Sequence, residues 1–311
     1  MSAGLVLDLV LVATILVVAV WTLLARASVA AVVAFAAFGL LLALAWVRLD
    51  AVDVALTEAP VGVITALLLL GAAARLRNAA APAPTPPPLR LAVGLLCAAV
   101  TGALATVVLF LPEPAPSLAT AAQAGLPATG LGNAVTAVLM AYRALDTLME
   151  KVVLVVGLLA VWSLAADALW DGRPAAAYAA SDSDGPLAFL ARVLPPVGIV
   201  VGAYVFWVSA DEPGGAFQGG AILAAMLLLT MMARLVDPPA LGGRPLRLAL
   251  VGGALVFFAV GLGGLAFGDG FLAYPAAFAK PLILLIEAAL IVAIALSLAL
   301  FVAGPAERPR P

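Results

Sequence analysis

The stretch YRALDTLMEKVVLVVGLLAVWSLAA, residues Tyr142 to Ala166, combines the two features that decide the fold. Its second part is a continuous apolar run of the kind that forms a helix inside a lipid bilayer. Its first part carries Arg143, Asp146, Glu150 and Lys151 within nine positions. A charged side chain at the centre of a bilayer costs roughly 3 kcal/mol, so these charges need water, a partner or a function.

The composition of the whole chain is that of an integral membrane protein. Of its 311 residues, 66% are hydrophobic and 10% are charged, whereas soluble domains are about 25% charged. The net charge of -2 leaves no basic patch for a nucleic acid. The chain has no histidine and a single cysteine, Cys97, in an apolar run. We therefore expect no disulfide, no metal site, and no cofactor other than a transient Na+ ion.

Nine apolar runs are long enough to cross a hydrocarbon core of about 30 Å. They predict an all-α integral membrane protein with about nine transmembrane helices. The first run lacks a preceding basic segment and contains Asp8, so we interpret it as a span and not as a signal peptide. The expected spans are Gly4–Leu24, Ser28–Val47, Val52–Ala74, Leu91–Leu111, Thr147–Leu169, Leu187–Ser209, Ala216–Leu235, Leu246–Phe267 and Tyr274–Val302.

The basic residues between these runs indicate the orientation of the chain. Eleven lie in alternate gaps or at the C-terminus, whereas only Arg48 and Arg143 lie in the other gaps. Cytoplasmic loops are enriched in Lys and Arg, so we expect an outer N-terminus and a cytoplasmic C-terminus. The eleven are Arg26, Arg75, Arg77, Arg90, Arg173, Arg192, Arg234, Arg244, Arg247, Arg308 and Arg310.

Two connectors divide the chain into three blocks. NAAAPAPTPPP is rich in proline and cannot form a helix, and AAAYAASDSDGP is rich in small residues and aspartate. The predicted organisation is a three-helix segment over 1–77, a linker over 78–90, a two-helix segment over 91–174, a linker over 175–186, and a four-helix segment over 187–311. This arrangement is typical of three polypeptides joined by fusion.

In the first block, Glu58 is the strongest candidate for a residue on an ion path. It lies about five residues beyond Asp53 and just before Pro60. Proline removes a helical hydrogen bond, and the loosened turn frees carbonyl groups that can coordinate a cation. The alternative is a carboxylate that reaches back to the outer interface, the position where we also expect Asp50 and Asp53.

In the second block, the spacing of Arg143, Asp146 and Glu150 places all three on one face of a helix. Lys151 points about 100° away from Glu150, which predicts that it does not neutralise Glu150 within the helix. LGNAVTAVLMAYRALD, just before, predicts a short amphipathic helix along the outer interface. The alternative to an ion path is an interfacial ladder of salt bridges. It suits Arg143 and Asp146 better than the deeper Glu150 and Lys151.

In the third block, DEPGGAFQGGAILAA places four glycines at the entry of a helix. Glycine permits close backbone approach, and free N–H groups at a helix start can face an anion or a neighbouring backbone. The segment lacks the Lys-Ser/Thr ending of a P-loop, so we interpret it as a tight turn followed by close helix packing. The loop residues are Gly214, Gly215, Phe217, Gln218, Gly219 and Gly220.

The last span carries Lys280 and Glu287, which lie seven residues apart on one helical face, about 10 Å from each other. Pro281 is expected to interrupt the helix between them. Glu287 lies near the middle of the span, where no interface is within easy reach. Together, Glu58, Glu150, Lys151, Lys280 and Glu287 form the predicted ion path, because buried acids and bases with waters between them conduct protons and cations.

Three segments resemble subunits of one family of membrane complexes. NAVTAVLMAYRALDTLMEKVVLVVGLLAVWSL resembles the C-terminal segment of the MrpA subunit of Mrp-type sodium/proton antiporters and the MbhE subunit of membrane-bound hydrogenases. DVALTEAPVG resembles MbhD, and PGGAFQGGAILAA is similar to the glycine signature of MrpB and MbhF. The resemblance implies a fusion of three subunits of a cation-translocating module related to respiratory complex I.

This resemblance implies a non-catalytic subunit of a hetero-oligomer in a bacterial or archaeal cytoplasmic membrane. The implied partners are large antiporter-like, MrpC-like and MrpD-like subunits, and Glu58, Glu150 and Glu287 are the implied path residues. The chain departs from the family at Ala141, where an acid is usual, and at Ala144, Met149 and Ala216, where glycine is usual. Two alternatives remain, a docking subunit that conducts no ions and a stand-alone transporter.

Overall fold

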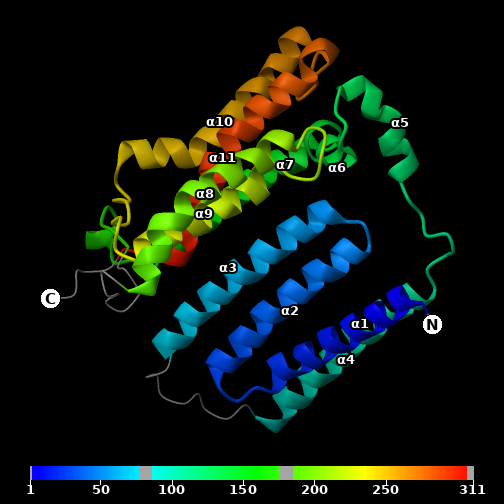
Figure 1. Ribbon diagram of the computed structural model, residues 1–311, viewed down its shortest axis with the longest axis vertical. Helices are drawn as coiled ribbons and strands as arrows, with labels where there is room; N and C mark the ends of the chain where they lie inside the picture. The colour runs from blue at the N-terminus through cyan, green and yellow to red at the C-terminus, as the bar shows by residue number, and fades with distance from the viewer. Residues whose placement is uncertain (1, 77–85, 175–184, 307–311) are drawn as a thin grey trace.

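The computed structural model describes residues 2–76, 86–174 and 185–306. These residues are almost entirely helical, and the extended pairing among them is a single bridge between Pro174 and Ala306. The prediction of an all-α membrane protein is confirmed at this level. Figure 1 shows the first four helices on one side of the molecule and the remaining long helices on the other.

The first three helices pack in chain order. They are α1 (Ala3–Leu24), α2 (Ser28–Arg48) and α3 (Val52–Leu76). A Cβ atom added to Gly39 of α2 would lie 3.2 Å from the Cα atom of Gly62 in α3, so small residues set this close contact. Asp8 of α1 forms a 2.7 Å ion pair with Arg48 of α2, which gives this predicted membrane carboxylate a partner.

Helix α4 (Pro87–Leu109) covers the expected fourth span, but it begins at Pro87, inside the proline-rich stretch that was predicted not to be helical; proline is tolerated in the first turn of a helix. Every residue of α4 is exposed in this chain. A further helix, α5 (Ala119–Thr129), lies where no element was predicted, so the second block contains more than two helices. It ends at Gly130, whose φ of 66° suits the left-handed residue that follows many helices.

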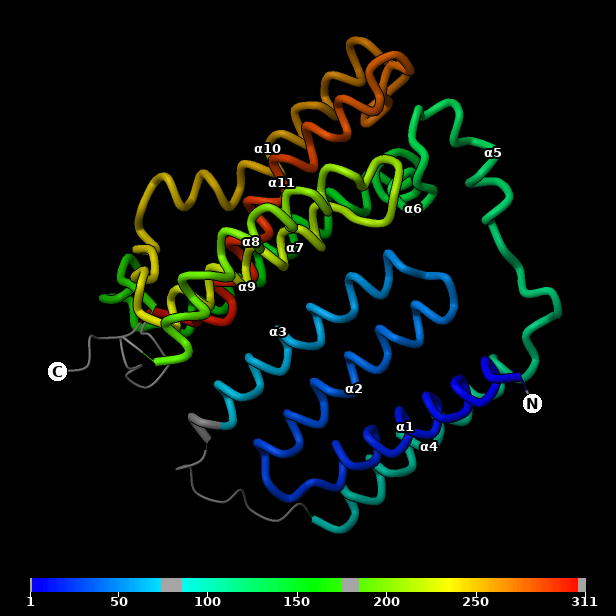
Figure 2. Tube along the Cα trace, in the orientation of Figure 1, coloured from blue at the N-terminus to red at the C-terminus, as the bar shows by residue number. Residues whose placement is uncertain are grey.

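The predicted amphipathic helix over LGNAVTAVLMAYRALD does not form as one element. The chain instead forms α6 (Ala134–Ala137) and a π-helical turn (Val138–Tyr142), and α6 with this turn is bent by 84° from α5 (Figure 2). The hydroxyl of Thr147 donates to the Leu139 carbonyl at 2.6 Å and ties the turn to the next helix. Ala137, Met140 and Ala144 are buried, but the exposed side carries Leu139 and Leu145, so the segment is apolar on both sides and not amphipathic.

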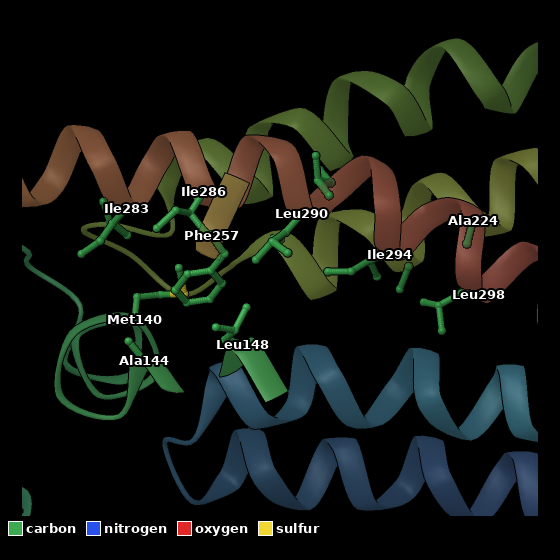
Figure 3. Packing of buried hydrophobic residues seen from close by; sticks show 14 of the residues in the cluster. Met140, Ala144, Leu148, Ala224, Phe257, Ile283, Ile286, Leu290, Ile294 and Leu298 are labelled. Atoms are coloured by element: carbon green, nitrogen blue, oxygen red, sulfur yellow. The ribbon is translucent and has the colours of Figure 1, made fainter. Parts of the chain in front are cut away.

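The second half of the molecule is organised around α11 (Ala279–Ala303). It packs against α9 (Ala216–Met232) and α10 (Arg244–Phe267), while α8 (Pro186–Val208) packs mainly on α9 and α7 (Ala144–Trp162) contacts α10 and α11. The core around α11 is shown in Figure 3 and includes Met140, Leu148, Ala224, Phe257, Ile283, Ile286, Leu290, Ile294 and Leu298. A helix that is apolar on all sides is typically buried, as α11 is here.

The nine expected spans all fall on helices, but two of these helices are too short or too charged to count as membrane spans by length and composition. Seven described helices are long and apolar enough to cross a membrane, or eight if the bent pair of α5 and α6 counts as one span. Of the other two helices, α9 has 17 residues and α7 carries three charged residues. Helix α7 also ends at Trp162 and not at Leu169. The number of spans, the orientation and the segment boundaries stay predictions, and both linkers lie partly outside the described residues.

Candidate functional site

The site is built around the segment that joins α8 to α9, which contains the glycine-rich motif. Backbone amides of Gly132 and Asn133 donate to the carbonyl of Ala210 at 2.8 and 3.1 Å. The hydroxyl of Thr136 donates to the carbonyl of Ser209 at 2.7 Å. These bonds hold the α8–α9 segment against the residues that precede the π-helical turn, so the second and third blocks meet here.

Asp53 attaches the first block to the same segment. Its carboxylate accepts a 2.9 Å hydrogen bond from the backbone amide of Gly214 and two 3.4 Å contacts from the side-chain amide of Asn133. The amide of Gln218 donates to the hydroxyl of Thr57 at 3.1 Å and to the carbonyl of Asp53 at 3.4 Å. Asp53 was expected only to support the site from the outer edge, but it connects all three blocks.

Glu287 lies on the other side of this segment and is 5% exposed. One carboxylate oxygen accepts a 2.5 Å hydrogen bond from the hydroxyl of Ser209, and the other accepts a 3.3 Å bond from the backbone amide of Ala216. A carboxyl group buried without partners would be strongly unfavourable, and these two donors compensate for its burial. The residue is therefore held in a defined position at the centre of the helical core.

Lys151 pairs with one acidic side chain and lies near the segment that binds a second. Its ammonium group forms a 2.7 Å ion pair with Glu150. It also faces the start of α9, where the backbone amide of Ala216 binds Glu287. It lies 5.5 Å from the ring centroid of Phe217, an arrangement that favours a cation. The Lys151 side chain is only 7% exposed, whereas that of Glu150 is 54% exposed. The three groups therefore run from the core towards the surface of the chain.

The prediction that Lys151 does not neutralise Glu150 within the helix is wrong. Their Cα–Cβ bonds do diverge around α7, but the lysine ammonium sits on a flexible four-carbon stem and can turn back towards its neighbour. The helix also begins at Ala144, so Arg143 is not one of its helical residues. Arg143 and Asp146 nevertheless form an exposed ion pair at 2.5 Å, which agrees with the interfacial ladder considered for these two residues.

The glycines of the motif allow close approach of neighbouring groups. A Cβ atom on Gly214 would overlap the carbonyl oxygen of Val205, and one on Gly220 would lie 2.8 Å from a methyl group of Ile294. A side chain at either position would force its surroundings to move. The predicted combination of a tight turn and close helix packing describes this geometry, and the same turn also positions Phe217 beside Lys151.

Lys280 does not join the group around Glu287. It forms an ion pair of 2.7 Å with Asp211, at the end of α8, and its side chain is 36% exposed. Pro281 does not interrupt the helix, because it lies in the first turn of α11, where proline is tolerated. Lys280 and Glu287 share one helix as predicted, but their side chains contact different partners.

Glu58 also stays apart from the other predicted path residues. Helix α3 continues through Pro60 without a break, and Glu58 is half-buried. Among the described residues it has no hydrogen bond or ion pair. The described part of the chain also contains no group of three or more acidic or cysteine side chains that could hold a metal ion.

Four polar residues of the site were missed from the sequence. Each is an uncharged polar residue, and three of them lie between small or apolar neighbours while Thr57 precedes Glu58, so each is a weak signal next to a membrane carboxylate. A systematic list of hydroxyl and amide side chains at the ends of apolar runs would have included all four. They are Thr57, Asn133, Thr136 and Ser209.

Comparisons with known proteins place these blocks in a family. Residues 13–78 match the MbhD family of MBH subunits, and residues 186–306 match a domain related to the MnhB subunit of a Na+/H+ antiporter. These two matches cover more than half of the chain. A chain in the structure of the Mrp complex from Dietzia sp. DQ12-45-1b aligns with 97% of this chain, with a TM-score of 0.69 and 26% identity. This chain is a fused membrane subunit of the Mrp/Mbh type.

Two further proteins are similar to parts of this Mrp/Mbh-type chain. A chain in the structure of the membrane-bound sulfane sulfur reductase, an archaeal respiratory membrane complex, aligns with 69% of this chain and over 97% of its own length, with a TM-score of 0.56 and 26% identity. An uncharacterized protein of Methanocaldococcus jannaschii is 32% identical in an alignment of 114 residues that covers 32% of this chain. This chain spans 44% of that curated relative and 35% of the Dietzia chain.

Proposed function

We propose that this subunit contributes a path of charged side chains for protons, sodium ions or both within an Mrp-like cation/proton antiporter module. The observation that carries the proposal is that Lys151 pairs with the half-exposed Glu150 and lies beside Phe217, next to the residue whose amide binds the buried Glu287. A cation near two acids can exchange partners, and each exchange moves charge between the core and the surface of the chain.

The proposal assigns the chain a non-catalytic role with no resident cofactor, and Na+ would be its cargo. Its expected location is a bacterial or archaeal cytoplasmic membrane, with nine spans and an outer N-terminus. Its expected partners are large antiporter-like, MrpC-like and MrpD-like subunits. Two features support this assembly: the match to an antiporter-related domain and the likeness to a chain of an Mrp complex.

The path can be tested by neutralising its carboxylates in the assembled complex. Inside-out membrane vesicles are energised, and a fluorescent pH probe reports how far added Na+ dissipates the proton gradient. We expect Glu287→Gln and Glu150→Gln each to reduce this exchange to near background. Glutamine keeps the shape and the hydrogen-bond acceptor but can neither release a proton nor carry charge.

The matched control is Asp8→Asn, which neutralises another membrane carboxylate without touching the α8–α9 segment. Asp8 pairs with Arg48 in the first block, so this change should leave exchange unaltered. Native gels must show that every variant assembles. If exchange survives Glu→Gln changes at Glu58, Glu150 and Glu287 in assembled complexes, the chain is not the conducting path.

The second candidate function is docking, and one observation favours it. Asn133 and Gly214, from the second and third blocks, both donate to Asp53 of the first block, as expected of a subunit that holds separate parts together. Asp53→Ala separates the two functions. A docking role alone predicts loss of the assembled complex, whereas the path carboxylates can be neutralised with assembly intact.

A further inference from the structure

One face of α7 remains uncovered by the rest of the chain. The side chain of Glu150 is 54% exposed, and only one of its oxygens is bonded, to Lys151. The residues around it on the helix surface are apolar and exposed: Leu145 is 51% exposed, Met149 47%, Val153 68% and Val156 58%. These five residues define the surface called here the Glu150 face, and the other four are apolar; at its edge the exposed Asp146, one turn before Glu150, is already paired with Arg143.

This acid lies within the apolar depth of the helices and not at their outer end. Leu148, two residues before it, packs in the same buried cluster as Ile283 and Ile286 of α11, shown in Figure 3. At the outer end of α11, by contrast, Lys280 pairs with Asp211 in the loop after α8. Glu150 therefore lies near the depth of Glu287, where lipid tails offer no hydrogen-bond donor.

A second copy of this chain would be a poor cover for the Glu150 face. A two-fold contact places the same surface on both sides of the interface. Two Glu150 carboxylates would then face each other, and like charges repel strongly where little water is present. A suitable cover is apolar and supplies a hydrogen-bond donor opposite the free oxygen of Glu150.

We infer that a membrane-spanning helix of a different subunit covers the Glu150 face and donates a hydrogen bond to Glu150 from a polar or basic side chain. This inference rests on the proposed function and extends it, because the path then leaves this chain sideways at Glu150. The donor gives the second carboxylate oxygen the partner that the chain itself does not provide.

The test uses the assembled complex in membranes. Cys97 is the chain's single cysteine and is exposed, so it is first replaced in a Cys97→Ser background. A nitroxide label is then attached to Val153→Cys, and its collision rate with oxygen is compared with that of a nitroxide on a lipid chain at the same depth. We expect a severalfold lower rate for the protein label, because a neighbouring helix excludes the lipid that carries oxygen.

Single cysteines are then introduced along the spans of each other subunit in turn. A short bismaleimide should crosslink Val153→Cys to a cysteine in one of these subunits. Oxygen collisions as frequent as in lipid, or an adduct with a second copy of this chain, would overturn the inference.

A further pair of variants tests the donor. Glu150→Gln should retain the neighbouring subunit in native gels, whereas Glu150→Leu should release it. These readouts do not involve transport. They can therefore fail while the path proposal stands, and the path proposal can fail while they succeed.

Discussion

Lys151 and Lys280 show how differently two lysines near the start of apolar helices can be used. Lys280 pairs with Asp211 at the end of the helical bundle, and its side chain is 36% exposed. Lys151 is 7% exposed, pairs with Glu150, and lies beside the ring of Phe217. Both form ion pairs of 2.7 Å. The bond lengths do not distinguish them, whereas the surroundings do, because a buried charge must have its partners in place before the helices can pack.

The largest effect is expected from Lys151→Met, which keeps the length of the side chain but removes its charge. Glu150 then loses its paired cation and the region near Glu287 loses a positive charge, so sodium-dependent proton exchange should fall to background in the vesicle assay. The change also removes the cation from its position beside Phe217. Retention of exchange in an assembled Lys151→Met complex would show that the buried lysine is structural.

A smaller effect is expected from Ser209→Ala. This change removes the hydroxyl that donates to Glu287 and leaves part of a buried carboxylate without a partner. Loss of a hydrogen bond to a charged group costs about 2 kcal/mol, so the complex should unfold at a lower temperature. Thermal unfolding of the purified complex measures this shift. Ser209→Thr, which keeps a hydroxyl, serves as the control, and an equal loss in both variants would attribute the effect to packing.

The smallest effect is expected from Lys280→Met. The ion pair with Asp211 is partly exposed, and such pairs contribute at most about 1 kcal/mol. Exchange activity should therefore stay near the wild-type level, and the unfolding temperature should shift less than in Ser209→Ala. A transport loss as large as that of Lys151→Met would contradict the contrast between the two lysines and return Lys280 to the ion path.

Much of the fold follows from the length of the apolar runs. Starts such as Val52 and Ser28 are as predicted because charged or small residues end the adjoining apolar runs. The region from Ala119 to Arg143 was less predictable. Its apolar residues face several directions, Thr136 just before the π-helical turn bonds the α8–α9 segment, and Thr147 of α7 bonds the turn itself, so contacts beyond the local pattern hold this region.

The sequence predicted which charged residues form the candidate site better than it predicted which of them contact one another. Glu150, Lys151 and Glu287 stand out in sequence because charge is rare in apolar runs. Their grouping depends on how α7 crosses α11, which no sequence spacing specifies. Spacing along one helix suggested that Lys280 belongs with Glu287. In the structure Lys280 instead forms an ion pair with Asp211, a residue that is distant in sequence.

The segment Gly214–Ala216 must keep its number of residues, whereas the residue type at Ala216 is free to vary. The amide of Gly214 binds Asp53 and the amide of Ala216 binds Glu287, with only Gly215 between them. Backbone amides make both bonds, so alanine in place of the usual third glycine keeps the second one. Inserting or deleting a single residue here would instead move one amide away from its carboxylate. In evolution, this segment is therefore expected to tolerate substitution at Ala216 but not a change in the number of residues.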